Sequence, residues 1–312
     1  MQSFPESARI EVPPSLATDL LRVTEKLPLY ENKAFYDLFL QETVYDTIRG
    51  GCLDGFDWLI GEIRTRLKTA PFSVLINGLK FDGGNRLFVA LNRAFGDLVA
   101  RPYKKPRAQL VHYIQPATDI KLAKGVHTEN EQLHTDCADW PELNALISMV
   151  CVRPDRHGGG HSRILHILDL REEICECFGP DMIRRLEQEL VPWRMADYLG
   201  GSVVWRPILS QDSLCWRRSL IDSALENADI ELSEQMVETL NAVEQIIRQT
   251  NRMIDFLMEA GEFLIMDNKR CIHARTPISG PLETSNRLML RSWIRAPEQQ
   301  ASSKRARKAS WV

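Results

Sequence analysis

At 312 residues, with 44% hydrophobic and 26% charged residues, the chain has the composition of a folded globular protein and not of a disordered one. Its formal net charge of −3 gives no electrostatic reason to expect nucleic acid as the main partner. The N-terminal stretch MQSFPESARIEVPP lacks an apolar signal-peptide core and no run reaches transmembrane length, so we expect a cytoplasmic protein that does not bind membranes.

The first third of the chain predicts helices followed by a buried strand. Apolar residues recur at three- and four-residue spacing over residues 16–27, 33–49 and 56–67, which is typical of amphipathic helices. Residues 71–79 (PFSVLINGL) are rich in β-branched and aliphatic side chains and predict a buried strand. Residues 85–99 then predict a helix that packs against this strand.

The middle of the chain predicts strands separated by polar segments. Strands are expected over residues 107–114, 143–152 and 162–167. Residues 115–131, between the first two strands, are polar and lack apolar periodicity. We interpret them as a mobile active-site loop, with plain surface as the alternative.

The last third mixes helices and strands. Helices are expected over residues 169–176 and 180–190, and Ser233 can cap a helix that ends near residue 249. A hairpin containing Trp205 is expected over residues 200–209. A strand–turn–strand unit is expected over residues 252–258 and 263–266. The seven cysteines form no C-x-x-C pair, which favours reduced thiols over a disulfide framework.

The order of these elements indicates the fold class. Many strands without a repeated β–α rhythm, with helices gathered at the ends, favour a mainly β chain with helical decoration (α+β) and a double-stranded β-helix (jelly roll) core. We expect a helical preface over residues 1–69 that packs on the core, a jelly-roll core with a helical insertion over residues 70–297, and a flexible basic tail over residues 298–312.

The stretch LHTD, which ends at Asp136, carries the first candidate site. His134 and Asp136 are two residues apart, so in an extended strand their side chains point to the same face. A distant histidine would complete a facial triad of two histidines and one carboxylate, which leaves open positions on a non-haem Fe(II). Our choice is His273, in the run MDNKRCIHART, for which a structural core histidine is the alternative.

Two other histidine patterns compete with this set. His127 and Glu129 form a second H-x-acid triplet seven residues upstream, and spacing alone leaves that pair open. We prefer the downstream triplet because it leads directly into an expected strand, which gives a rigid platform. His157 and His161 have the spacing of a helical zinc pair, but three glycines join them and disfavour a helix.

These motifs together resemble those of a known family. The LHTD stretch, the Gly-rich turn HGGGHSR at 157–163, the distal histidine and the run NRLMLRSWIR at 286–295 are similar to the taurine dioxygenase (TauD/TfdA) and clavaminate synthase-like superfamily of Fe(II)/2-oxoglutarate-dependent oxygenases. The resemblance covers residues 70–296. It implies three catalytic residues that bind the metal: His134, Asp136 and His273.

The resemblance also implies a site for 2-oxoglutarate. Arg287 and Arg291 match the family's R-x-x-x-R, in which the second arginine grips the distal carboxylate and the first lies near the proximal end. A planar guanidinium suits a carboxylate because it donates two parallel hydrogen bonds. Ser162, directly after the Gly-rich turn, stands where the family has a hydroxyl that helps to hold 2-oxoglutarate; a turn-capping hydroxyl is the alternative.

The activity that the resemblance implies is a dioxygenase reaction that uses Fe(II), 2-oxoglutarate and O₂. We expect hydroxylation, or another oxidation, of an unactivated C–H bond in a small polar metabolite, such as an amino acid or an amino-acid-derived intermediate of secondary metabolism. Arg275, Arg217 and Arg218 are spare arginines that could meet a substrate carboxylate. A sulfonate dioxygenase, a catalytically inactive jelly-roll binding protein and a zinc hydrolase are the alternatives, and a homo-oligomer is left open.

Overall fold

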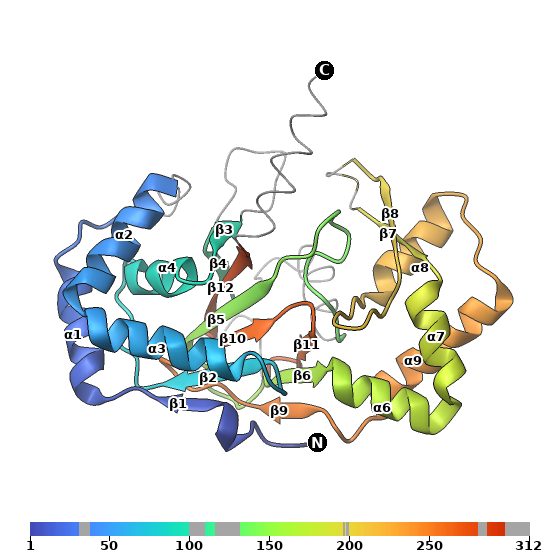
Figure 1. Ribbon diagram of the computed structural model, residues 1–312, viewed down its shortest axis with the longest axis horizontal. Helices are drawn as coiled ribbons and strands as arrows, with labels where there is room; N and C mark the ends of the chain where they lie inside the picture. Colours follow the sequence, from blue (N-terminus) through green and yellow to red (C-terminus); the bar gives the residue numbers. More distant parts are fainter. Residues whose placement is uncertain are drawn as a thin grey trace.

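A mixed sheet runs through the middle of the molecule, and helices gather on two sides of it (Figure 1). The computed structural model describes residues 1–30, 38–99, 110–115, 132–195, 197, 200–279 and 286–296. In spatial order the sheet contains β1 (Arg9–Glu11), β2 (Ser73–Asn77), β10 (Phe263–Asp267), β5 (Leu146–Arg153), β12 (Leu288–Arg295) and β3 (Asp97–Val99), and β4 (His112–Ile114) also pairs with β12. β1 and β2 pair in parallel, and the other neighbours are antiparallel.

A smaller sheet carries one of the expected site residues. It contains β11 (Cys271–Arg275), β6 (Ser162–His166) and β9 (Ile254–Phe256), which are all antiparallel. In the register of β11 and β6, Arg275 lies opposite Ser162 and His273 lies opposite Ile164. A separate hairpin pairs β7 (Val191–Arg194) with β8 (Val203–Arg206).

The described helices form two groups at opposite ends of the long axis in Figure 1. The first group contains α1 (Pro14–Glu25), α2 (Leu38–Gly51), α3 (Leu53–Arg66) and α4 (Arg86–Arg93), and the short 3₁₀-helix η1 (Glu6–Ala8) precedes β1. The second group contains α6 (Ile167–Phe178), α7 (Pro180–Gln188), α8 (Arg218–Asn227) and α9 (Glu234–Gln249). Among all the residues that the structure describes, no helix is long and apolar enough to cross a membrane.

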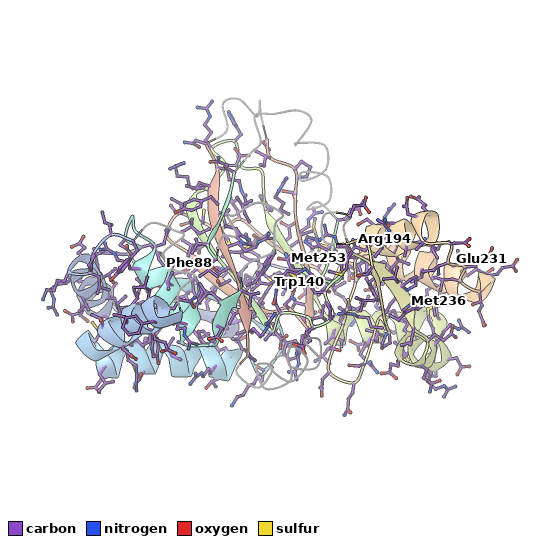
Figure 2. All side chains as sticks on the ribbon, turned by 90° about the horizontal axis from the view of Figure 1, so that it is seen from above. Phe88, Trp140, Arg194, Glu231, Met236 and Met253 are labelled. Carbon is purple, nitrogen blue, oxygen red and sulfur yellow. The ribbon has the colours of Figure 1, made fainter. Side chains whose placement is uncertain are left out.

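Two hydrophobic cores lie on opposite faces of the large sheet. Successive side chains of a strand point to opposite faces, and in β2 Leu75 belongs to one core whereas Val74 belongs to the other. Figure 2 shows Phe88 on the side of the first helical group and Met236 among the helices of the second group. Because each face is covered by its own helices, the strands between them are fixed from both sides.

Most of the predicted elements are confirmed. Ser233 caps α9 as expected, because its hydroxyl oxygen accepts a hydrogen bond from the Met236 amide at 3.2 Å. The α+β class is also confirmed, but helical residues outnumber strand residues in the described ranges, so "mainly β" is wrong. The confirmed elements are α1, α2, α3, β2, β5, β6, α6, α7, α9, β9 and β10.

Two local predictions are wrong, and one helix was not predicted. The helix expected to reach residue 99 ends at Arg93, because Gly96 turns the chain against the Arg295 carbonyl with φ +153° and β3 then pairs with β12. The hairpin expected within 200–209 has only one of its strands there, and its partner is the short β7. α8 was not expected at all.

Some predictions concern residues outside the described ranges. They are the active-site loop from residue 116 to 131, the alternative ligands His127 and Glu129 within it, and the basic tail over residues 298–312.

Candidate active site

His134 and His273 meet through their backbones as well as through their rings. The His134 amide donates to the His273 carbonyl at 3.0 Å, and the His273 amide donates to the His134 carbonyl at 2.9 Å. The ring centroids lie 4.6 Å apart, and both side chains are buried. β11 therefore positions both rings, one directly and one through this pair of hydrogen bonds.

Asp136 completes the group, although not from a regular strand. The expectation of an extended strand over residues 134–136 is wrong, because His134 forms an isolated bridge and a turn begins at Asp136, with Cys137 at φ +59°. The carboxylate still lies 3.4 Å from His134 Nε2 and 4.0 Å from His273 Nε2. One ligand atom from each of the three residues lies within 4.8 Å of the others, so the three could share one metal ion.

The Asp136 carboxylate is held in its ionised form. Its Oδ2 accepts hydrogen bonds from Arg291 Nη1 at 3.0 Å and from Trp293 Nε1 at 2.8 Å. Burial opposes ionisation, but Arg291 and the two histidines outweigh it and hold the pKa of this carboxyl well below its usual value. A carboxylate that stays charged at this depth suits a bound cation.

Each of the two histidines offers a ring nitrogen to the metal-binding group. His134 Nδ1 lies 2.8 Å from the Gln132 carbonyl, which can only accept, so Nδ1 carries the proton and Nε2 is left as a donor atom for a metal. His134 Nε2 is buried and has no hydrogen-bond partner among the described residues. Burial, and next the neighbouring His134, lower the pKa of His273 to about 3, so its ring is neutral. A buried nitrogen without a hydrogen-bond partner among the described residues, a neutral second imidazole and one carboxylate fit a divalent metal such as Fe(II).

A pocket beside this group gathers the other predicted site residues. His134 and His273 line it together with Ser162, Arg287 and Arg291. Arg287 is buried, and no ion pair to it is found within the described chain. Burial, and next the nearby Arg275, lower the pKa of Arg287 to about 10. An anion in this pocket would relieve the repulsion between these two guanidinium groups.

The other arginines and histidines considered in the sequence lie in different parts of the structure. Arg275 lines the pocket just described, whereas Arg217 and Arg218 lie at the start of α8. His161 contacts Asp255, with 2.7 Å between Nδ1 and Oδ1, and His157 contacts Arg156. These two histidines are not part of the metal-binding group.

Sequence reasoning missed three residues that support the site: Asn268, Trp293 and Gln132. Asn268 is fully buried and accepts a hydrogen bond from the Asp136 amide. It stands in the Asp267–Asn268 pair that frames the distal histidine, but that pattern does not show which backbone the amide contacts. Trp293 lies two residues after Arg291 on β12, and strand alternation could have placed both on one face.

Comparisons with known proteins show the family to which this fold and this group of residues point. The model of the family "Taurine catabolism dioxygenase TauD, TfdA family" matches residues 61–293, which confirms the resemblance seen in the sequence. No curated protein sequence gives a significant match.

Solved structures share the fold at low sequence identity. Asparagine oxygenase in complex with Fe(II), 2S,3S-3-hydroxyasparagine and succinate is 14% identical, with a TM-score of 0.74, over 92% of this chain and 93% of that one. The non-heme iron oxygenase OrfP with Fe and alpha-ketoglutaric acid is 15% identical, with a TM-score of 0.68, over 96% of both chains. OrfP with Fe, succinate and (3S)-hydroxy-L-Arg is 13% identical, with a TM-score of 0.70, over 95% and 96%.

Proposed function

The chain belongs to the taurine catabolism dioxygenase TauD, TfdA family and is therefore an Fe(II)- and 2-oxoglutarate-dependent dioxygenase, and from that membership we propose that it hydroxylates a C–H bond of an amino acid or an amino-acid-derived metabolite. Two of the proteins that share its fold, asparagine oxygenase and OrfP, are described with hydroxylated asparagine and hydroxylated arginine. Those names support the substrate class of this proposal.

We propose His134, Asp136 and His273 as the catalytic residues that hold the iron. Their convergence from distant parts of the chain into one buried group is the observation that supports this proposal most. When bound, Fe(II) with 2-oxoglutarate and O₂ supplies the oxidising power: one oxygen atom enters succinate as CO₂ leaves, and the other enters the substrate as a hydroxyl group. The chain's own part is to hold the two imidazoles and the charged carboxylate together in one buried group.

The geometry favours a different division of roles for the two arginines of R-x-x-x-R from the one expected from the sequence. Arg291 contacts a carboxylate of the metal-binding group, so it lies at the metal end of the pocket. Arg287 and Ser162 line the same pocket, and Arg287 makes no such contact. Since 2-oxoglutarate chelates iron at its keto end, we propose that Arg287 holds the distal carboxylate, with Ser162 beside it, and that Arg291 lies near the proximal end.

Several broader expectations remain part of the proposal. We propose a double-stranded β-helix core over residues 70–297, with the helical preface over residues 1–69 packed on it and the tail over residues 298–312 outside it. The shared fold supports the first of these, and the contacts of α1 with α4 and of β1 with β2 support the second. A cytoplasmic location, a small-molecule substrate without nucleic-acid or membrane partners, and an open oligomeric state stay predictions.

A screen of amino acids that measures succinate release, with and without Fe(II), tests this function. We expect Fe(II)-dependent succinate formation that a substrate stimulates, together with a product heavier by one oxygen atom. Iron-independent hydrolysis would favour the zinc hydrolase. Absence of Fe(II)-dependent succinate with every compound would favour a binding protein that has lost its chemistry, and stimulation by sulfonates alone would favour a sulfonate dioxygenase.

A further inference from the structure

A second cavity adjoins the pocket that Arg287 lines. Its volume is about 350 Å³, which is within the roughly 300–1,000 Å³ of small-molecule sites. His134 and Ala274 line both spaces, so the second cavity adjoins the metal-binding group at His134. Met253, which also lines it, lies near the centre of the molecule in Figure 2. A molecule in this cavity would therefore lie beside the iron.

Positive charge dominates the wall of this cavity. Its lining includes four arginines and one glutamate: Arg163, Arg217, Arg218, Arg248 and Glu244. The Glu244 carboxylate forms ion pairs with two of these arginines, at 2.5 Å from Arg248 and at 3.6 Å from Arg218. Arg163 and Arg218 are paired as well, with Asp255 at 2.8 Å and with Asp222 at 2.7 Å. The cavity therefore offers a ligand the N–H donors that these pairs leave over, and its wall contains no carboxylate that is free of arginine contacts within the described residues.

Two of these arginines stand where a helix disfavours them. Arg217 is the N-cap residue of α8 and Arg218 is its first residue. The N-terminus of a helix carries partial positive charge from its unpaired amides, so a cation there is electrostatically unfavourable and an anion is favourable. An anionic ligand in the cavity would be attracted by both the guanidinium groups and the first turn of the helix.

Arg218 is held in a fixed position. Its Nε donates to Asp222 Oδ1 at 2.7 Å and its Nη1 donates to Asn241 Oδ1 at 2.9 Å. Because α8 and α9 both fix this side chain, little of its conformational entropy would be lost when it binds a ligand.

We propose that this cavity is the substrate site and that Arg217 and Arg218 bind an anionic side-chain group, so that the substrate is an acidic amino acid. The anionic group is an oxyanion, either a carboxylate or a sulfonate. The inference rests on the proposed function, which it narrows from amino acids in general to those with a negatively charged side chain. A basic side chain such as that of arginine would find no carboxylate in the cavity wall that is free of arginine contacts within the described residues, and its binding is therefore disfavoured.

Matched pairs of compounds test this inference. Binding to the full chain with Fe(II) and 2-oxoglutarate, without O₂, is measured by calorimetry for aspartate against asparagine, glutamate against glutamine, and aspartate against cysteate. In the first two pairs the acid is expected to bind at least about 10-fold more tightly than its amide, because a charge-assisted contact replaces a neutral one. Cysteate carries a sulfonate in place of the side-chain carboxylate and distinguishes the two oxyanions.

Variants locate the selectivity. Arg217→Gln and Arg218→Gln are each expected to reduce the preference for acid over amide by about 10-fold. Arg184→Gln, at an exposed arginine of α7 outside the cavity, is expected to leave the preference unchanged.

The inference is overturned if the amides bind as tightly as the acids, if basic amino acids are preferred, or if no acidic compound binds. Fe(II)-dependent succinate formation without any substrate is measured first on the unmodified protein. If that activity is present and the acidic preference is absent, this inference fails while the proposed function stands.

Discussion

The carboxamide of Asn268 holds the backbone of Asp136 from both sides. Asn268 Oδ1 accepts a hydrogen bond from the Asp136 amide at 3.0 Å, and Asn268 Nδ2 donates to the Asp136 carbonyl at 3.0 Å. The same Nδ2 donates to the Asn144 carbonyl at 3.1 Å. The turn that presents the carboxylate is thus tied to the turn between β10 and β11, and β11 presents His273, so Asn268 is a positioning residue for the metal-binding group.

Replacing Asn268 by alanine is expected to weaken Fe(II) binding by about 10- to 100-fold, as is usual when a partner of a ligand is removed. It also leaves the buried Asp136 amide without its partner, which costs roughly 1–3 kcal/mol of unfolding free energy. Metal binding by calorimetry and unfolding by denaturant measure the two effects. Asn268→Asp keeps the acceptor for the Asp136 amide and loses both donated hydrogen bonds. Its Fe(II) affinity and its unfolding free energy should therefore lie between those of the unmodified protein and those of Asn268→Ala.

Asn227→Ala removes an exposed amide that only contacts its own helix, and it serves as the control. Fe(II) affinity that is unchanged in folded Asn268→Ala would show that the carboxamide supports the fold without positioning the ligand.

Replacing Asp136 by alanine is expected to abolish Fe(II)-dependent succinate formation. The change removes the one carboxylate of the metal-binding group, and it leaves Arg291 and the Trp293 indole without their shared acceptor. Since this loss could also destabilise the fold, Asp136→Asn is the second variant, because it keeps an acceptor and removes the charge. We expect both to lower Fe(II) affinity by at least about 100-fold.

The matched control for Asp136 is Asp212→Ala, at an exposed carboxylate that contacts Arg270. Full turnover by Asp136→Ala would move the carboxylate ligand elsewhere, with Glu129 as the next candidate.

Periodicity predicted most of the fold because most elements bury one face. α9 has apolar residues at helical spacing and an N-capping Ser233, so the sequence predicts both that this segment is a helix and where the helix begins. β7 is only four residues long and contains Pro192, and its existence depends on pairing with β8. α8 starts with two arginines and no side-chain cap, which is the opposite of a helix-start signal. Elements that depend on tertiary contacts were the ones missed.

For the site, the sequence indicated residue types and left the three-dimensional contacts open. The structure brings His134, Asp136 and His273 together. The H-x-D spacing was interpreted through strand alternation, yet the pair lies at a bridge and a turn, so the reason given for their common direction was wrong. Spacing alone does not separate the roles of Arg287 and Arg291, because a separation of four residues predicts one common face of a strand, whereas β12 begins only at Leu288. Only their distances from Asp136 separate them.

Arg287→Ala is expected to raise the KM for 2-oxoglutarate at least about 10-fold more than Arg291→Ala does, because a lost bidentate contact to a carboxylate is worth about 1.5–3 kcal/mol. Arg291→Ala releases a hydrogen bond to Asp136 and should mainly lower kcat and Fe(II) affinity. Titration of 2-oxoglutarate at saturating Fe(II) measures both. The reverse order of KM effects would restore the assignment based on the sequence.

A pair of glycines in the turn before β6 tests the same pocket from its backbone. Gly158 and Gly160 have φ +76° and +72°, so an alanine at either is strained by about 1–2 kcal/mol. A Cβ at Gly160 would lie 2.7 Å from Arg287 Nε, whereas a Cβ at Gly158 meets no described atom within 4 Å. Both variants should lose similar unfolding free energy from strain, with a further loss at Gly160. Only Gly160→Ala should raise the KM for 2-oxoglutarate, because it displaces Arg287; an equal rise in Gly158→Ala would show that turn strain, and not this displacement, controls the pocket.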